Sequence, residues 1–142
     1  PGGVIRLIEW EPPITTSQAV ESVFGRFIAA LDQQGKTVIK GGRHMGIILL
    51  LTRLLEHLRC QDLQETAHVI NFSAGTPEYE TGMADTIRSV ETMGVFLLNT
   101  RMLTQRELTE VEQQMRHDLA SPDFLGLIFF VSAWGRKPLT GK

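Results

Sequence analysis

The feature of this chain that most constrains its fold is a repeated change in the period of its hydrophobic residues. Short runs rich in β-branched and aromatic residues alternate with longer segments whose apolar residues recur every three or four positions, which is the spacing of an amphipathic helix. The short runs, which we expect to be strands, are 4–10, 37–40, 67–72, 95–100 and 125–132. The longer segments, which we expect to be helices, are 18–34, 45–59, 77–93 and 105–120.

Strands that alternate strictly with helices are typical of α/β domains. Right-handed crossovers would place the helices on both faces of the sheet. We therefore expect a three-layer domain with a five-stranded, mostly parallel sheet, whose first, third and fourth strands are central and mutually parallel. In outline this resembles flavodoxin-like and Rossmann-like folds, a resemblance that carries no function. The length of 142 residues suits a single domain, 1–142, with 136–142 as a polar, flexible tail.

Local signals mark where several helices begin and end. Thr15–Gln18 and Thr104–Glu107 have the Ser/Thr-x-x-Gln/Glu form of a capping box, in which side chains at a helix start satisfy free backbone N–H groups. Gly35 and Gly94 each follow a periodic apolar segment, as glycines often do just after a helix. We therefore expect the third helix to end before Gly94 and the fourth strand to follow it.

Charge and composition bound the broad class of the protein. The chain has 14 Lys and Arg residues, 16 Asp and Glu residues and a net charge of −2. Because it has no block of like charge, we expect no general nucleic-acid binding, although a local basic site is compatible with these numbers. The longest apolar stretch, 45–51, is too short to span a membrane. A single cysteine, Cys60, excludes an intrachain disulfide and favours the cytoplasm or another reducing compartment.

In the expected layout, three loops that open helices are candidates for a ligand site. Free backbone N–H groups at a helix start attract anions, and small or hydroxyl-bearing residues let a phosphate or carboxylate approach closely. Arg43 would add a charge-assisted hydrogen bond. The alternative is that the hydroxyls only cap helices and that Arg43 is solvated in a tight turn. The predicted anion-binding residues are Thr15, Thr16, Ser17, Gly41, Gly42, Arg43, Ser73 and Gly75.

No motif identifies a catalytic centre, a cofactor or a metal. None of the histidines lies four residues from another, and one cysteine cannot build a thiolate zinc site, so we expect no metal site. The phosphate-binding and nucleophile-elbow glycine patterns are absent as well. Glu11, just past the first strand, is a carboxylate whose pKa could be raised for acid–base work. Whether the chain is an enzyme, with which catalytic residues and which cofactor, therefore stays open.

Two functions from different classes fit these patterns. The first is a binding domain for a small anionic molecule, such as a nucleotide or a phosphorylated metabolite. The second is a non-catalytic assembly module within a larger complex, or a structural protein of a virus or mobile element. This second interpretation depends on the apolar run 127–131, which would lie at the sheet edge, and on the segment 45–59, which is apolar nearly all round. Both features predict a homo-oligomer, most simply a dimer.

Overall fold

The structure, a computed structural model, describes residues 2–138, and this part of the chain contains one three-stranded sheet. Its strands are β1 (Val4–Thr15), β2 (Gln61–Asn71) and β3 (Gly126–Arg136), in the order β1-β3-β2. Both neighbouring pairs are antiparallel. The predicted three-layer fold with a five-stranded, mostly parallel sheet is therefore wrong. The last strand of the chain is the central strand of the sheet rather than an edge strand.

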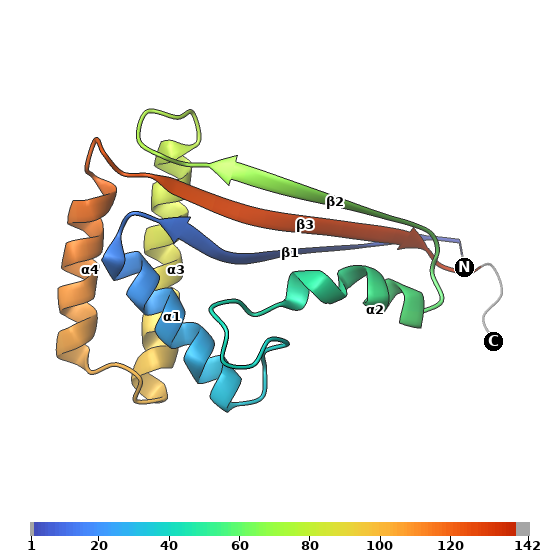
Figure 1. The fold of residues 1–142 in the computed structure, drawn as a ribbon, viewed down its shortest axis with the longest axis horizontal. Helices are drawn as coiled ribbons and strands as arrows, with labels where there is room; N and C mark the ends of the chain where they lie inside the picture. Colours follow the sequence, from blue (N-terminus) through green and yellow to red (C-terminus); the bar gives the residue numbers. More distant parts are fainter. Residues whose placement is uncertain (1, 139–142) are drawn as a thin grey trace.

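The helices form two groups along the sheet (Figure 1). α1 (Gln18–Gln33), α3 (Tyr79–Asn99) and α4 (Gln105–Leu119) gather at one end of the strands and pack on one another. The short 3₁₀ helix η1 (Ile47–Leu50) and α2 (Leu51–His57) lie along the other end. The larger apolar core lies within the three-helix group, and a smaller one lies between α2 and the sheet. The chain is thus an antiparallel sheet with segregated helices, an α+β arrangement.

The segment 95–100, predicted to be a strand, forms the end of α3 instead, with Thr100 as the C-cap of the helix. Along this helix Val90, Met93 and Leu97 are buried, whereas Val95 is 61% exposed. This is the spacing of one buried helical stripe and not of a strand. The helix forms because its apolar residues at these positions all reach the core shared with α1 and α4.

Three further predictions differ from the structure: the helix end before Gly94, the strand at 37–40 and the helix at 45–59. Gly94 lies inside α3 and does not end it. A Cβ at this position would lie 2.9 Å from the Leu108 side chain, so glycine here lets α3 and α4 approach closely. The segment 37–40, also predicted to be a strand, forms bends and has no partner in the described sheet. The helix predicted at 45–59 is present only in part, as η1 followed by α2.

The predictions of helices at α1 and α4 are confirmed, but α1 begins at a different cap: its N-cap is Ser17 rather than Thr15, and the capping box predicted at Thr15–Gln18 is not the cap observed. Ser17 caps α1, where its Oγ accepts a hydrogen bond from the Val20 N–H at 3.2 Å. Gly35 follows this helix with a φ of +69°, which glycine adopts without strain. Thr104 and Glu107 form a reciprocal capping box at the start of α4. The ends at Gly35 and Thr104 are determined by neighbours along the chain, which is why the sequence predicts them well, whereas Ser17 also binds Asp118 of α4.

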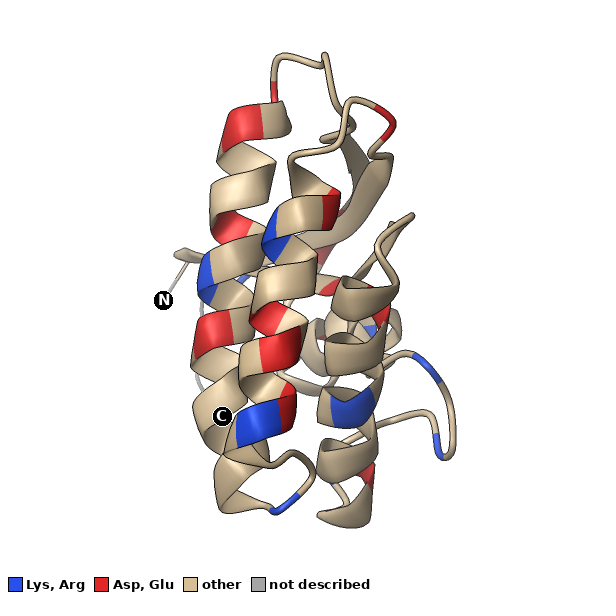
Figure 2. Cartoon of the chain, turned by 90° about the vertical axis from the view of Figure 1, so that its left-hand side faces the viewer, with Lys and Arg blue, Asp and Glu red and all other residues tan. Residues whose placement is uncertain are grey.

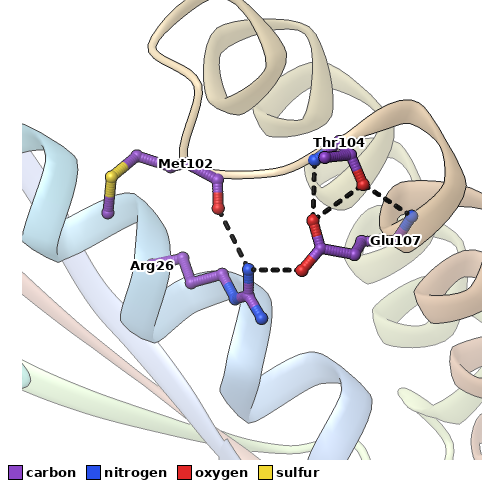
Figure 3. Close-up of polar contacts among 4 residues, drawn as sticks. All are labelled: Arg26, Met102, Thr104 and Glu107. Carbon is purple, nitrogen blue, oxygen red and sulfur yellow. Dashed lines mark hydrogen bonds and ion pairs between the residues drawn. The ribbon is translucent and has the colours of Figure 1, made fainter.

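The capping box of α4 also joins that helix to α1 (Figure 3). Arg26 donates from Nη1 to the Met102 carbonyl at 3.0 Å and to Glu107 Oε1 at 3.3 Å. Hydrogen bonds from the backbone N–H and the hydroxyl of Thr104, assisted by Arg26, hold the pKa of Glu107 below its ordinary value. The carboxylate therefore stays charged next to the positive end of the α4 dipole.

The two faces of the sheet differ in what covers them. Alternate residues of a strand point to opposite faces, and residues paired across antiparallel strands share a face. Ala133 of β3 is fully buried against Leu51 and Leu55 of α2, and this side is called the α2 face. The opposite side carries both tryptophans of the chain and is called the Trp face. Its members are Val4, Arg6, Ile8 and Trp10 of β1, Gln64, Thr66, His68 and Ile70 of β2, and Ile128, Phe130, Ser132, Trp134 and Arg136 of β3.

The position of β3 explains its apolar sequence. Because β3 pairs with β1 on one side and β2 on the other, the run 127–131 is a central strand, and its backbone needs no second chain. The segment 136–142, predicted to be a flexible tail, begins inside this strand at Arg136. The next residue, Lys137, donates its N–H to the Gly3 carbonyl at 2.7 Å. Residues 139–142 lie outside the described part of the chain.

Candidate functional site

A hollow of about 430 Å³ lies between the Trp face and α3. This volume is within the range of small-molecule sites in proteins. The side formed by the strands and α1 is apolar. The side formed by α3 and its N-cap residue, Glu78, is polar. The apolar floor consists of Trp10, Phe24, Ile70, Phe72, Ile128 and Phe130. The polar wall consists of Glu78, Thr81, Gly82, Asp85, Thr86, Arg88 and Ser89.

Aromatic packing holds the floor in place. The β1–β3 register sets Trp10 opposite Phe130. The Trp10 ring meets Phe24 of α1 edge-on, with ring centroids 6.0 Å apart, a geometry that aromatic pairs prefer. Phe72, just after β2, is 2% exposed and packs 5.6 Å from the Phe124 ring. The floor is therefore a fixed aromatic surface that exists before any ligand arrives.

The wall is a row of polar side chains along α3. Thr81, Asp85 and Ser89 are four residues apart and so lie on one side of the helix. Within residues 2–138, their side chains form no hydrogen bond or ion pair, and the same holds for Glu78 and Arg88 at the rim. A polar row that faces an apolar floor is unlike a packed core, where facing surfaces are both apolar. A ligand that is apolar on one side and hydrogen-bonding on the other would satisfy both surfaces.

The structure brings several of the predicted anion-binding residues together, at a place separate from the lining of the hollow. The Thr16 N–H donates to the Leu125 carbonyl at 3.0 Å, and Thr16 Oγ1 accepts from the Leu125 N–H at 3.0 Å. Ser73 Oγ accepts from the Gly126 N–H, also at 3.0 Å. Thr16 and Ser73 therefore lie against consecutive residues. Gly75 lies two residues further along the same loop, with a φ of +82°.

Carboxylates of the chain itself stand at the start of α1. Ser17 Oγ donates to Asp118 Oδ2 at 2.7 Å, and the Thr15 N–H donates to Glu21 Oε1 at 2.8 Å. Burial acts to raise the pKa of Asp118, but hydrogen bonds from Ser17 and Gln114 outweigh it and hold the pKa below its ordinary value. Two acidic groups thus already use the helix start that an added anion would need. Anion binding at this place stays a prediction.

The glycine loop before η1 reaches the same helix start. Arg43 forms an ion pair with Glu21, although its side chain is otherwise largely exposed. The Gly41 N–H donates to Asp32 Oδ2 at 2.9 Å, and Gly42 is exposed on the same loop. Glu21 therefore links Thr15 to Arg43, whereas the Ser73 loop meets Thr16 only through Leu125 and Gly126, and most of these polar groups bind the chain itself.

We expect Asp32 to give this glycine loop a pH-dependent anchor. Its carboxylate accepts from Thr37 Oγ1 at 2.6 Å and from the Gly41 N–H, and it pairs with Lys40 Nζ at 3.1 Å. These contacts, with the Thr37 bond as the largest, lower the pKa of Asp32 from 3.8 to about 2. A carboxyl group whose pKa is depressed by folding stabilises the fold above its unfolded pKa and loses that contribution as pH falls through the folded pKa. The contribution of Asp32 should therefore disappear between pH 3.8 and about 2.

Two measurements check this expectation for Asp32. An NMR titration of its carboxyl carbon should give a midpoint near 2. Asp32→Asn should lower the free energy of unfolding at neutral pH and converge with the parent at the acid end of the titration. Asp123→Asn, at an exposed turn position, is the control and should leave the two unfolding curves superposed. A carboxyl midpoint near 3.8 would contradict the prediction.

Other candidate groups have structural roles. Glu11 is 5% exposed and accepts from the N–H groups of Met45 at 2.8 Å and Gly46 at 2.7 Å, so it holds the loop before η1. Cys60 is buried. Across residues 2–138, no three His, Cys, Asp or Glu side chains come together as a metal ion would require. No helix in the described chain has the length and apolar character needed to cross a membrane.

The sequence interpretation did not find the hollow. Tyr79 and Val90, within the segment predicted as the third helix, pack against the core. The signal for the site is the neighbouring row at 81, 85 and 89, which keeps one helical face polar for three turns. That row becomes informative only when it is known which face of the sheet it meets.

Comparison with protein-family models finds no match for this chain, and a search of curated proteins finds no relative.

Proposed function

We propose that this chain is a ligand-binding domain and that the ligand occupies the hollow between the Trp face and α3. The observation that carries the proposal is the pairing of a rigid aromatic floor with a polar wall on which the side chains of Thr81, Asp85 and Ser89 have no partner in the described chain. Binding sites combine a mostly apolar cavity with a few convergent polar groups in this way. The binding function expected from the sequence is kept, but the proposed site lies at a different place in the molecule.

The chemistry of the hollow defines the part of the ligand that enters it. A planar or apolar group would lie on Trp10 and Phe130, where burial of apolar surface contributes about 25 cal/mol per Å². Hydrogen-bond donors on its other side would reach Asp85 and the neighbouring hydroxyls. The rim carries two carboxylates and one guanidinium, so this entering part is neutral or cationic rather than anionic. Any anionic group of the ligand would have to lie outside the hollow.

The alternative function, assembly into a larger complex, has less support from the geometry. Its first motive was an apolar edge strand, and that strand is central in the sheet. Its second motive was a helix apolar all round. There Leu51 and Leu55 are buried against the sheet, while Leu49, Leu54 and Leu58 are exposed. This exposed leucine group is the part of the assembly interpretation that remains, and oligomerisation stays a prediction.

We expect Thr81→Phe to close the hollow and to weaken binding of an apolar probe at least about tenfold, which corresponds to about 1.4 kcal/mol. The probe is 1-anilinonaphthalene-8-sulfonate, followed by energy transfer from the tryptophans, one of which lines the floor. Thr81 is exposed at the rim, so a larger side chain there can turn into the hollow without opening the core.

The matched control is Thr92→Phe. Thr92 is also an exposed threonine of α3, but it does not line the hollow. Both variants should keep the unfolding midpoint of the parent within a few degrees, and only Thr81→Phe should lose probe binding. Equal loss in both variants, or no saturable binding by the parent, would overturn the proposed function.

A further inference from the structure

We propose that the Trp face binds single-stranded nucleic acid, with one base in the hollow and the neighbouring nucleotides over the open part of the sheet. This inference rests on the proposed function and names the class of ligand. Three observations lead to it: a separation of charge between the two faces of the sheet, the placement of the aromatic residues, and the continuity of the open face with the hollow.

Charged residues of the strands are sorted by face. Glu9, Glu11 and Glu65 lie on the α2 face, because they pair with Val131, Phe129 and Ala133 of β3. The Trp face carries Arg6, His68 and Arg136 and no carboxylate at its regular ladder positions. Asp62, at the irregular start of β2, pairs with Arg136 at 3.5 Å. The net charge of −2 therefore conceals one locally basic face, which the overall composition does not reveal.

This basic face is not part of a larger basic surface. Along α1, α3 and α4, acidic and basic positions are interspersed (Figure 2). An anionic chain would therefore be attracted to the sheet and not to the helix bundle.

The aromatic residues add stacking surfaces to the same face. Arg6 lies over the Trp134 ring at 5.6 Å from the centroid and donates from Nε to Ser132 Oγ at 2.7 Å. These two contacts hold the guanidinium over the indole, although Arg6 as a whole is exposed. Bases in single strands stack on aromatic rings and on guanidinium planes, and phosphates accept hydrogen bonds from the same guanidinium.

The open face and the hollow form one continuous surface. Phe130 belongs to both, and Trp134 follows it by four residues on β3, which is about 13 Å along a strand. Between them, Ser132 is flanked by Ile8 of β1 and Thr66 of β2. A strand of nucleotides could thus place one base over Phe130, facing the acceptors of α3, while its backbone continues toward Arg6.

Charge also decides between this ligand and a second copy of the chain. Two Trp faces packed against each other would bring Arg6 and Arg136 toward the same residues of the other copy. The carboxylates nearby are Asp62, already paired with Arg136, and Glu78 and Asp85 at the rim of the hollow. Like charges brought together in this way oppose self-association. The exposed Val4 and Ile8, at 62% and 55%, are therefore better matched by bases than by a second sheet.

The test is a titration of the tryptophan fluorescence of the full chain with oligothymidine of about 12 nucleotides, at about 50 mM and about 200 mM salt. We expect saturable quenching that weakens at the higher salt, with a log–log slope of about −0.7 for each phosphate contact. Arg6→Ala should weaken binding about tenfold to a hundredfold. Arg6→Lys should restore the salt slope of the parent but not its affinity, because lysine keeps the charge and loses the flat stacking plane.

Arg106→Ala is the matched control, since Arg106 is an exposed arginine of α4 that contacts Glu110 and does not belong to the Trp face. It should leave oligothymidine binding unchanged. Absence of quenching at low salt, or equal effects of the two arginine variants, would overturn the proposal. So would a parent that light scattering shows to be a dimer and that Arg6→Ala turns into a monomer, because a second copy would then cover the face.

Failure of this inference can be told apart from failure of the proposed function. If the anilinonaphthalene probe binds the parent and is lost in Thr81→Phe, while oligothymidine does not bind, the hollow is a ligand site and the nucleic-acid proposal is wrong. If oligothymidine binds but Thr81→Phe leaves its affinity unchanged, no base enters the hollow, and the proposed path of the strand is wrong. Loss of oligothymidine in both Thr81→Phe and Arg6→Ala is the supporting result.

Discussion

Gly82→Ala is expected to destabilise the protein by about 1–3 kcal/mol, the usual cost of overpacking a filled core. Local propensity predicts the opposite sign, because alanine is about 1 kcal/mol more favourable than glycine inside a helix. The reason is the position of Phe72. A Cβ on Gly82 would lie 2.6 Å from Phe72 Cγ and closer still to its Cβ. These atoms are next to the Phe72 backbone, so turning the ring cannot relieve the clash and the end of β2 or α3 itself has to shift. Chemical denaturation followed by circular dichroism measures the effect.

Gly25→Ala is the matched control for this prediction. Gly25 is a glycine inside α1, and a Cβ there would meet no heavy atom within 4 Å. This substitution should stabilise the protein by about 0.5–1 kcal/mol. Opposite signs at Gly82 and Gly25 would show that α3 approaches the sheet as closely as described. A Gly82→Ala variant as stable as Gly25→Ala would mean that Phe72 lies elsewhere, and the floor of the hollow with it.

The elements that could be predicted from the sequence are those determined by neighbours along the chain. α1 and α4 have their caps, their apolar stripes and their end signals within one segment each. The existence of β1, β2 and β3 also follows from short β-branched runs, although each strand is longer than predicted. β1 continues through Pro12 and Pro13 because the register shifts there, and proline is tolerated at such an irregularity.

The sheet order could not be predicted, because it depends on contacts between distant segments. A run such as 127–131 is equally apolar in a buried parallel strand and in the central strand of an antiparallel sheet. The polar first half of β2 shows little hydrophobic pattern, since β2 is an edge strand and most of its residues are exposed. The alternation of short apolar runs with segments of helical period therefore suggested parallel strands joined by helical crossovers, but the strands of the chain form antiparallel pairs.

The candidate site was missed for the same reason. The polar row on α3 and the aromatic residues of the Trp face come from segments far apart in the sequence, and only the register aligns Trp10 with Phe130. The sequence could suggest anion-binding residues because helix starts have recognisable residue types. The sequence could not show that Glu21 and Asp118 would take up the same helix start.

Leu97→Ala should cost about 2–5 kcal/mol of unfolding free energy, the range for deleting a buried leucine side chain. Leu97 is 0% exposed and belongs to the core shared by α1, α3 and α4, so the truncation leaves a cavity at the centre of the helix group. Urea denaturation monitored by tryptophan fluorescence gives the change in free energy, and an unchanged m-value would show that the two-state transition is intact.

Val95→Ala makes this measurement decisive for the element that the sequence misassigned. In a strand, residues 95 and 97 would share a face and be buried or exposed together. In α3 they lie on different sides, and Val95 is 61% exposed. Val95→Ala should therefore leave the stability unchanged or raise it by about 0.5 kcal/mol, because alanine is the better helix former. Large losses of stability in both variants would favour a buried strand at 95–100. A loss confined to Leu97→Ala requires the helix, because the helical period of about 3.6 residues places positions 95 and 97 on different sides, whereas a strand places them on the same face.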